Sequence, residues 1–461
     1  MRSAVLVGLG LVPSLGFAVE VGLFEGDWSL AKWSSPTRLR EAYENPTTGA
    51  AYTTEDSRDD DVPAGMNLVD AWYSDPVRAQ TQDFAISSTG QVTGDETGTV
   101  IGLSRNRLLY RGVDVLTTVF ANPAGDILVE SKREEDLQDL NIALKKPESL
   151  TLAELAGTWN LISLIQPDDL TTFGNLGDVI FQGESSVTKG QVQLNANGTF
   201  SGLFSGTLAI DGTNLLVLAG SDPITFRVNA GKNLAIPTLE RDDEAEIVLL
   251  VRKPDALTTA QLAGNWRFNR MSIPSALTEV FFNTVTEETR EADSSGMAGD
   301  NEILVDLFHR DRFELERGNL RVQPNGSVAD SAVTSMAVGP DQTAIVNADG
   351  ETFEFFINSD FSILVGAFTD PDSQALIVLL KSEEEAAASN EAALDLLPIQ
   401  AGGSFLLSWA GSTETRLEFA TDGGGFAEIG STLGQDAIEI DTATFPRAIF
   451  RLVDGPPAAS N

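Results

Sequence analysis

The chain has 461 residues, of which 42% are hydrophobic and none is cysteine, and its formal net charge is −38. This length predicts about three domains, and the lack of cysteine excludes a disulfide framework and thiol catalysis. Nucleic-acid phosphates and anionic membrane surfaces are bound through clustered basic residues, so the excess of Asp and Glu argues against both as partners. The charge is typical of a soluble protein whose copies repel one another.

Residues 1–18 have the pattern of a secretory signal. The positive start Met1-Arg2-Ser3 precedes an apolar run, and Gly16-Phe17-Ala18 offers a small-x-small cleavage site. The apolar run is too short to span a membrane. We therefore expect cleavage after Ala18 and a secreted bacterial protein, extracellular or periplasmic, without membrane insertion. A buried N-terminal strand is the alternative interpretation.

One pattern, G-x-W-x7-P-x2-L, organises most of the chain. It occurs three times, as Gly26, Trp28, Pro36, Leu39; Gly157, Trp159, Pro167, Leu170; and Gly264, Trp266, Pro274, Leu277. Self-similarity at this spacing predicts an array of related modules. Proline-containing junctions place the module boundaries, giving modules 1, 2 and 3 at residues 19–147, 148–254 and 255–381.

A short helix and a strand are expected at the start of each module. Thr151 with Glu154, and Thr258 with Gln261, form capping boxes, which satisfy free backbone N–H groups at a helix start. The residues after each Gly-x-Trp alternate between apolar and polar, as in a half-buried strand. The motif proline ends this strand because proline has no N–H to donate.

Turn signals divide the rest of each module into further strands. Asn197-Gly198 and Asn325-Gly326 separate alternating runs, a strong hairpin signal, and Thr89-Gly90 holds the same place in module 1. Module 2 reads as about eight short strands in succession, which can remove their exposed edges by closing into a barrel. The predicted fold is all-β, with three tandem antiparallel meander barrels.

The end of the chain departs from this pattern. Residues 382–404 are rich in Glu and Ala and read as an acidic linker. Residues 405–461 contain short strand-like runs and predict a small C-terminal β module, which is short for an independent core.

A Gly-x-Trp on the first strand of an eight-stranded meander, after one helical turn, resembles the lipocalin-like (calycin) barrels. The resemblance implies that the glycine allows close backbone approach at the barrel floor, that the tryptophan plugs the floor, and that a basic residue after the last strand stacks on it. The implied structural plug residues are Gly26, Trp28, Gly157, Trp159, Gly264, Trp266 and Arg252. Lys145 holds the equivalent place in module 1, whereas module 3 offers only Lys381. The modules are shorter than lipocalins and lack their disulfide, C-terminal helix and second motif.

No residue pattern predicts catalysis, a cofactor or a metal site. His309 is the only histidine, so zinc and haem chemistry lack a ligand set. Acidic clusters at the last hairpin of each module could hold calcium but fit no known loop, and we interpret them as solvated turns; they are Glu134, Glu135, Asp136; Asp242, Asp243, Glu244; and Asp370, Asp372, with Asp59, Asp60 and Asp61 in module 1.

Three aromatic residues outside the shared pattern are candidate exposed contacts. Trp33, Trp72 and Tyr73 belong to module 1, in or beside its long insertion, and unpatterned loop aromatics often mark contacts. The resulting hypothesis is a secreted, non-catalytic protein that binds a partner or builds a surface structure, with a small apolar ligand or a surface polymer as partner. A calyx-type binder of a small apolar ligand and a carboxylate-based carbohydrate-active enzyme are the alternatives, and the oligomeric state is open.

Overall fold

The structure is a computed structural model. It describes residues 21–54, 65–104, 106–112, 115–133, 137–167, 171–173, 179–181, 185–218, 224–241, 244–293, 299, 301–328, 333–348, 350–382, 394–398, 404–409, 415–421, 427–428, 437–441 and 448–454. No helix in these ranges has the length and apolar character needed to cross a membrane.

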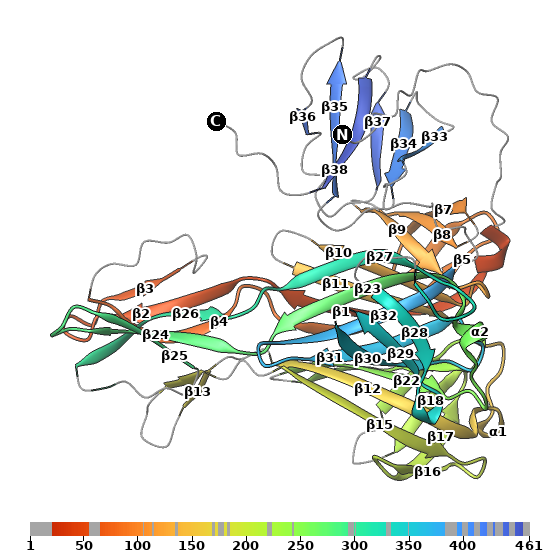
Figure 1. Cartoon of the computed structure of the whole chain (residues 1–461), viewed down its shortest axis with the longest axis horizontal. Coiled ribbons are helices and arrows are strands. Elements are labelled where there is room, and N and C mark those ends of the chain that lie inside the picture. Colours follow the sequence, from red (N-terminus) through yellow and green to blue (C-terminus); the bar gives the residue numbers. More distant parts are fainter. Residues whose placement is uncertain are drawn as a thin grey trace.

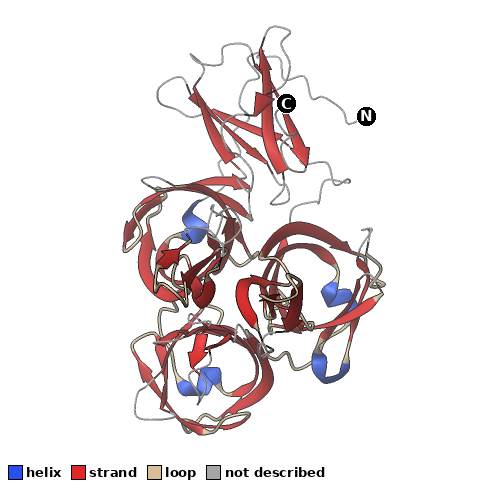
Figure 2. Cartoon of the chain, turned by 90° about the vertical axis from the view of Figure 1, so that its left-hand side faces the viewer, coloured by secondary structure: helices blue, strands red, loops and turns tan. Residues whose placement is uncertain are grey.

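The protein is all-β, as predicted. Three barrels lie side by side, and Figure 2 shows them nearly end-on, each with a short helical segment at its end. A flat arm extends from the barrels on the left of Figure 1, and the C-terminal strands lie above them in the same view. We call the three barrels the first, second and third in chain order.

The first barrel is closed by eight strands in the order β1-β11-β10-β9-β8-β7-β6-β5. A 3-10 helix, η1 (Val21–Phe24), precedes it. Its strands are β1 (Gly26–Pro36), β5 (Arg78–Ile86), β6 (Gln91–Gly94), β7 (Gly98–Ser104), β8 (Arg107–Arg111), β9 (Leu116–Ala121), β10 (Ile127–Arg133) and β11 (Leu137–Lys145).

The second barrel is also closed, because its first strand pairs with its last. Two short strands, β20 and β21, both pair with the last strand, β22. They are separated by Pro237, which interrupts the ladder because proline has no N–H to donate. After α1 (Leu152–Leu155), its strands are β12 (Gly157–Pro167), β15 (Ser186–Leu194), β16 (Thr199–Gly202), β17 (Gly206–Asp211), β18 (Asn214–Leu218), β19 (Ile224–Val228), β20 (Leu234–Ile236), β21 (Thr238–Arg241) and β22 (Glu244–Arg252).

The third barrel has seven paired strands instead of the expected eight, in the order β27-β23-β32-β31-β30-β29-β28. Where the second barrel has β16, the described residues of the third form two isolated bridges, Ser327 with Ser335 and Val328 with Val322. Its elements are α2 (Thr259–Leu262), β23 (Gly264–Pro274), β27 (Glu314–Val322), β28 (Val333–Val338), η2 (Pro340–Gln342), β29 (Ala344–Ala348), β30 (Glu351–Ile357), β31 (Ile363–Thr369) and β32 (Ser373–Ser382).

The first strand of each barrel follows the sequence pattern closely. Strands β1, β12 and β23 each begin at the motif glycine and end at the motif proline. Both predicted capping boxes are present, with Thr151 and Thr258 as the N-cap residues of α1 and α2. The helical turn and the tryptophan strand therefore form one local unit in the second and third barrels.

The arm is built from the variable segments after the first and third motif prolines. One sheet contains β2 (Leu39–Glu44), β3 (Ala51–Thr53) and β4 (Asn67–Tyr73), and the other contains β24 (Leu277–Asn283), β25 (Thr289–Asp293) and β26 (Glu302–His309). They meet at the arm of Figure 1, where β4 contacts β26. A shorter hairpin, β13 (Thr171–Phe173) with β14 (Val179–Phe181), follows the second motif proline.

A buried carboxyl group links the two sheets of the arm. Glu41 accepts hydrogen bonds from the Tyr43 hydroxyl at 2.8 Å and from the backbone N–H of Leu307 at 3.1 Å. Burial raises the pKa of Glu41 to about 7, because desolvation disfavours the charged form.

The three barrels share a core on their outer faces. Its members include Trp33 from β1, Ile162 and Leu164 from β12, and Met271 and Ile273 from β23. These strands alternate between the interior of their own barrel and this shared core. Both faces of the first strand of each barrel are therefore buried.

A ring of polar side chains joins three equivalent turns, which connect β9 to β10, β19 to β20, and β30 to β31. The side-chain amide of Asn122 donates to Asp126 at 2.7 Å and to Ser362 at 3.2 Å. Asn229 and Asn358 act in the same way, each donating within its own turn and to the preceding module: Asn229 to Asp126 and Asn233, and Asn358 to Asn233 and Ser362. We call this arrangement the turn ring.

The C-terminal part contains two small sheets. One consists of β33 (Leu394–Pro398), β34 (Ser404–Trp409) and β37 (Ala437–Asp441), and the other of β35 (Thr415–Thr421), β36 (Ala427–Glu428) and β38 (Ala448–Asp454). Strand β33 lies inside the stretch predicted as an acidic linker and pairs with β34. The second half of residues 382–404 therefore includes part of the C-terminal sheet.

Candidate ligand cavity in the first barrel

Each barrel is occupied at one end by its motif tryptophan. Trp28, Trp159 and Trp266 are fully buried. Each indole N–H donates to a backbone carbonyl of the preceding helical segment, at Phe24 (2.9 Å), Leu155 (2.9 Å) and Leu262 (2.8 Å). The tryptophan and the helical segment thus hold each other in place at the floor of the barrel.

A basic side chain from the last strand also reaches each helical segment. Arg252 donates to the carbonyls of Glu154 and Ala156 at 2.8 and 3.0 Å. Lys145 donates to Leu23 O at 3.1 Å and Lys381 to Gln261 O at 2.9 Å. Lys381 Nζ also lies 5.5 Å from the centre of the Trp266 ring, within cation–π range.

The motif glycines adopt a backbone conformation that other residues avoid. Their φ angles are +135° at Gly26, +142° at Gly157 and +132° at Gly264. A Cβ at Gly26 or Gly264 would lie 3.0 Å from the Cε of Lys145 or Lys381. Glycine is needed here for both its φ angle and the approach of the basic side chain.

Two of the three predicted exposed aromatic residues are buried, so their expected exposure is wrong. Trp33 is fully buried in the shared core, and Tyr73 is 4% exposed, whereas Trp72 is half-buried. Tyr73 stacks on His309 with ring centres 5.9 Å apart. The outer face of β1 and the inner face of the arm are covered by other modules, which a single module's sequence does not show.

His309 packs against aromatic rings, and the described acidic hairpin turn at Asp370 is held by backbone hydrogen bonds. The edge of the His309 ring contacts Phe313, with centres 5.2 Å apart. Asp370 uses its carboxylate to accept from the backbone N–H groups of Asp372 and Ser373. Residues 59–61, 134–136 and 242–243 lie outside the described residues. Within the described part of the chain, no three or more His, Cys, Asp or Glu side chains are arranged to hold a metal ion.

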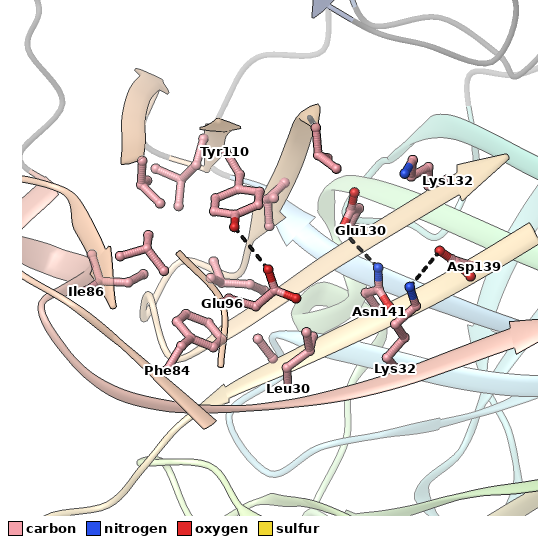
Figure 3. A pocket seen from close by; sticks show the side chains of 17 residues that line it. Leu30, Lys32, Phe84, Ile86, Glu96, Tyr110, Glu130, Lys132, Asp139 and Asn141 are labelled. Atoms are coloured by element: carbon pink, nitrogen blue, oxygen red, sulfur yellow. Dashed lines mark hydrogen bonds and ion pairs between the residues drawn. The ribbon is translucent and has the colours of Figure 1, made fainter. Parts of the chain in front are cut away.

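The interior of the first barrel holds a cavity of about 140 Å³ (Figure 3). The part nearest Trp28 is apolar, and Phe84 there stacks on Trp28 with ring centres 6.2 Å apart. The apolar lining residues are Leu30, Phe84, Ile86, Val92, Val100, Leu108, Val115, Val119, Leu128 and Ala143. This end of the cavity suits an uncharged hydrocarbon group.

The layers farther from Trp28 are polar and charged. Lys32 forms an ion pair with Asp139 at 3.2 Å, and the side-chain amide of Asn141 donates to Glu130 at 3.0 Å. Tyr110 donates to Glu96, also at 3.0 Å. Figure 3 shows these pairs around one space. Strand register explains the layering, since Leu128 lies opposite Ala143, Glu130 opposite Asn141, and Lys132 opposite Asp139.

The carboxyl group of Glu130 is held in an unfavourable setting for its charge. Burial raises its pKa, and the neighbouring Asp139 carboxylate adds to the shift. Hydrogen bonds from Thr117 and Asn141 and the charge of Lys132 oppose the shift without cancelling it. The cavity therefore contains a carboxyl group that an added positive charge would stabilise in its ionised form.

Four of the equivalent places in the third barrel carry apolar residues, whereas the place of Lys32 carries Arg270, which pairs with Glu316 at 3.1 Å. The two barrels can be aligned on equivalent pairs, Trp28 opposite Lys145 and Trp266 opposite Lys381. In this alignment the third barrel has Gly366, Phe368, Ala375 and Ile377 where the first has Glu130, Lys132, Asp139 and Asn141, respectively. Rings occupy the glycine gaps, because a Cβ at Gly366 would lie 2.5 Å from Phe355, and one at Gly318 would lie 2.3 Å from Phe268.

The second barrel has an interior of intermediate polarity at these positions. It carries Ser163 at the position of Lys32, and Pro237, Glu246 and Val248 at those of Glu130, Asp139 and Asn141. The polar layers of the first barrel were not predicted from the sequence. A readable signal was present, because Lys32 falls on the same face of its strand as Trp28 and Leu30, where Ser163 follows Trp159 and Leu161.

The fold and the cavity together define an all-β protein of antiparallel meander barrels, the first of which encloses a space with an apolar floor and charged walls. No family model and no curated protein matches the chain. Among solved structures, it is similar to transferrin binding protein B from serogroup B Neisseria meningitidis, with 10% identity over 77% of each chain and a TM-score of 0.21. It is also similar to a Trp-176-Ala mutant of transferrin binding protein B from Haemophilus parasuis, with 9% identity over 77% of this chain and 76% of that chain, and a TM-score of 0.17.

Proposed function

We propose that the protein is a secreted, non-catalytic binding protein and that the first barrel is its ligand site. The observation that carries the proposal is the contrast between the first barrel, with its cavity and charged layers, and the third, where ring side chains fill the same space.

The size of the cavity limits the ligand. A space of about 140 Å³ suits a short chain or a single ring, not a sugar polymer or a long lipid. Burying about six methylene groups contributes about 4–5 kcal/mol, which corresponds to a dissociation constant near the millimolar range before any polar contact is made.

Native mass spectrometry of the mature protein, exported by a bacterial host and kept folded, tests this proposal. We expect a reproducible excess mass that solvent extraction removes, and renewed binding when a six-carbon probe is added. A bare mass, together with no binding of hexylamine, hexan-1-ol or hexanoate, would contradict a ligand site in the first barrel.

A structural or adhesive role is the second candidate. It is favoured by the filled third barrel and by the core shared between all three barrels and the arm. This role predicts an arm that binds a surface polymer while the barrels bind nothing. Deleting the arm strands would then abolish binding, whereas substitutions in the first barrel would not.

Secretion, the module boundaries and the lipocalin-like plug are further parts of the proposal. Residues 1–20 lie outside the described residues, so cleavage after Ala18 stays a prediction, which intact mass of the exported protein tests. The boundaries at residues 147, 254 and 381 also stay predictions. Support for the plug comes from the equivalent hydrogen bonds of Trp28, Trp159 and Trp266.

A further inference from the structure

Two buried acceptor atoms, on side chains that line the first-barrel cavity, lack hydrogen-bond partners among the described residues. They are Asp139 Oδ1 and Asn141 Oδ1. Asp139 is 3% exposed and Asn141 8%. The other oxygen of Asp139 pairs with Lys32, and the amide nitrogen of Asn141 donates to Glu130, which fixes the orientation of both groups.

Both unsatisfied atoms are acceptors, so a ligand that satisfies them must supply donors. Leaving a buried acceptor unpaired is costly, and such atoms in native proteins usually have an explanation. Water also donates hydrogen bonds, but the cavity is several times larger than the space of one water molecule, and its floor is apolar. A ligand with donors at one end and hydrocarbon at the other matches both parts.

The charges in the cavity wall favour a cation. Three carboxyl groups line it, those of Glu96, Glu130 and Asp139, against two ammonium groups, those of Lys32 and Lys132. One added positive charge therefore balances the wall. An anion would meet a wall already in carboxylate excess, and a neutral alcohol supplies a donor but leaves the excess uncompensated.

We propose that the ligand of the first barrel is a small organic cation, an ammonium group on a short apolar chain or ring, whose N–H groups donate to Asp139 and Asn141. Its apolar part lies on the floor formed by Phe84, Leu108 and Leu128. The proposal rests on the first barrel being a ligand site. An ammonium has three donors and no acceptor, so it can donate to both oxygens and keep one N–H for a second carboxylate of the wall.

Calorimetric titration of the full mature chain with hexylamine, hexan-1-ol and hexanoate tests the proposal. The three probes share a chain length and differ in charge. We expect hexylamine to bind at least about tenfold tighter than hexan-1-ol, the effect of one charge-assisted hydrogen bond, and hexanoate to bind most weakly.

Paired variants locate the effect. Asp139→Asn should weaken hexylamine binding about tenfold and change hexan-1-ol binding little. The matched control is Glu246→Gln, because Glu246 holds the same register position in the second barrel, opposite Ile165 as Asp139 is opposite Ser34. This control should leave hexylamine binding unchanged.

A variant that is expected to strengthen amine binding makes the test independent of folding defects, because a misfolded chain would only lose binding. Lys132→Gln removes a positive charge from the wall and should strengthen hexylamine binding several-fold while weakening hexanoate binding. If hexan-1-ol binds as tightly as hexylamine, or if Lys132→Gln weakens amine binding, the proposal of a cationic ligand is wrong, while the proposal that the first barrel is a ligand site is retained. If no probe binds the wild-type chain, the ligand site fails as well.

Discussion

The first and third barrels have the same floor and different interiors. Both place a tryptophan against a helical segment and a lysine beside a glycine of positive φ. Above that floor, the first barrel carries Glu130 and Asn141 where the third carries Gly366 and Ile377. The floor and the shared outer core specify the fold, so the interior layers are free to differ.

The floor should respond alike in every barrel. Trp28→Ala, Trp159→Ala and Trp266→Ala each remove a fully buried indole, and we expect each to cost about 3–5 kcal/mol. Urea unfolding followed by hydrogen exchange in the affected barrel measures the loss. Trp72→Ala, at a half-buried arm position, is the control with a smaller loss. An undiminished stability for Trp28→Ala alone would show that the first barrel has no structural floor.

The motif glycine is the next most sensitive position. Gly157 has a φ of +142°, and alanine in such a conformation should cost about 1–3 kcal/mol. The measurement is the shift in urea midpoint. Gly22→Ala serves as the control, because nothing lies within 4 Å of a Cβ there and its φ is not in the positive range. Equal midpoints for the two variants would remove the reason given for the Gly-x-Trp pattern.

One substitution should have opposite effects in two barrels. Ala143→Leu adds volume to the first-barrel cavity, where the second barrel already has Leu250, and should stabilise by up to about 1 kcal/mol while abolishing probe binding. Ala235→Leu places the same change in the packed second barrel, where Ala235 is 1% exposed, and should cost about 1–3 kcal/mol. Thermal unfolding compares them. Destabilisation by both would mean that the first barrel is as full as the others.

Acidity should weaken cation binding in the first barrel slightly. The pKa of Glu130 is raised by burial, so its carboxylate takes up a proton at a higher pH than an ordinary Glu, while an alkylammonium stays charged. We therefore expect hexylamine to bind more weakly at pH 5.5 than at pH 7.5. Titrations at both pH values measure this fall. Glu130→Gln should flatten the dependence, and hexan-1-ol should show none; a steeper fall in the variant would contradict the role of Glu130.

The sequence predicted the local units well and the contacts between modules poorly. The strands from Gly157 to Pro167 and from Gly264 to Pro274, and the capping boxes before them, follow from short-range rules of turn and cap chemistry. The burial of Trp33 does not, because it depends on neighbouring barrels that cover its side of β1. The cavity was also missed, since pairing Asp139 with Lys132 and Asn141 with Glu130 requires the register between β10 and β11.

The turn ring has a consequence for how the chain reaches its folded state. Asn122 and Ser362 are separated by 240 positions yet share a hydrogen bond, and Asp126 accepts from Asn229 as well. As the chain emerges from its N-terminal end, the buried Asp126 carboxyl group therefore gains its full set of donors only when the second barrel has formed, and Asn122 gains its contact with Ser362 only when the third has formed. Contacts that distant make folding slow. The turn ring can therefore form completely only after all three barrels have folded, and its formation is the last step of assembly.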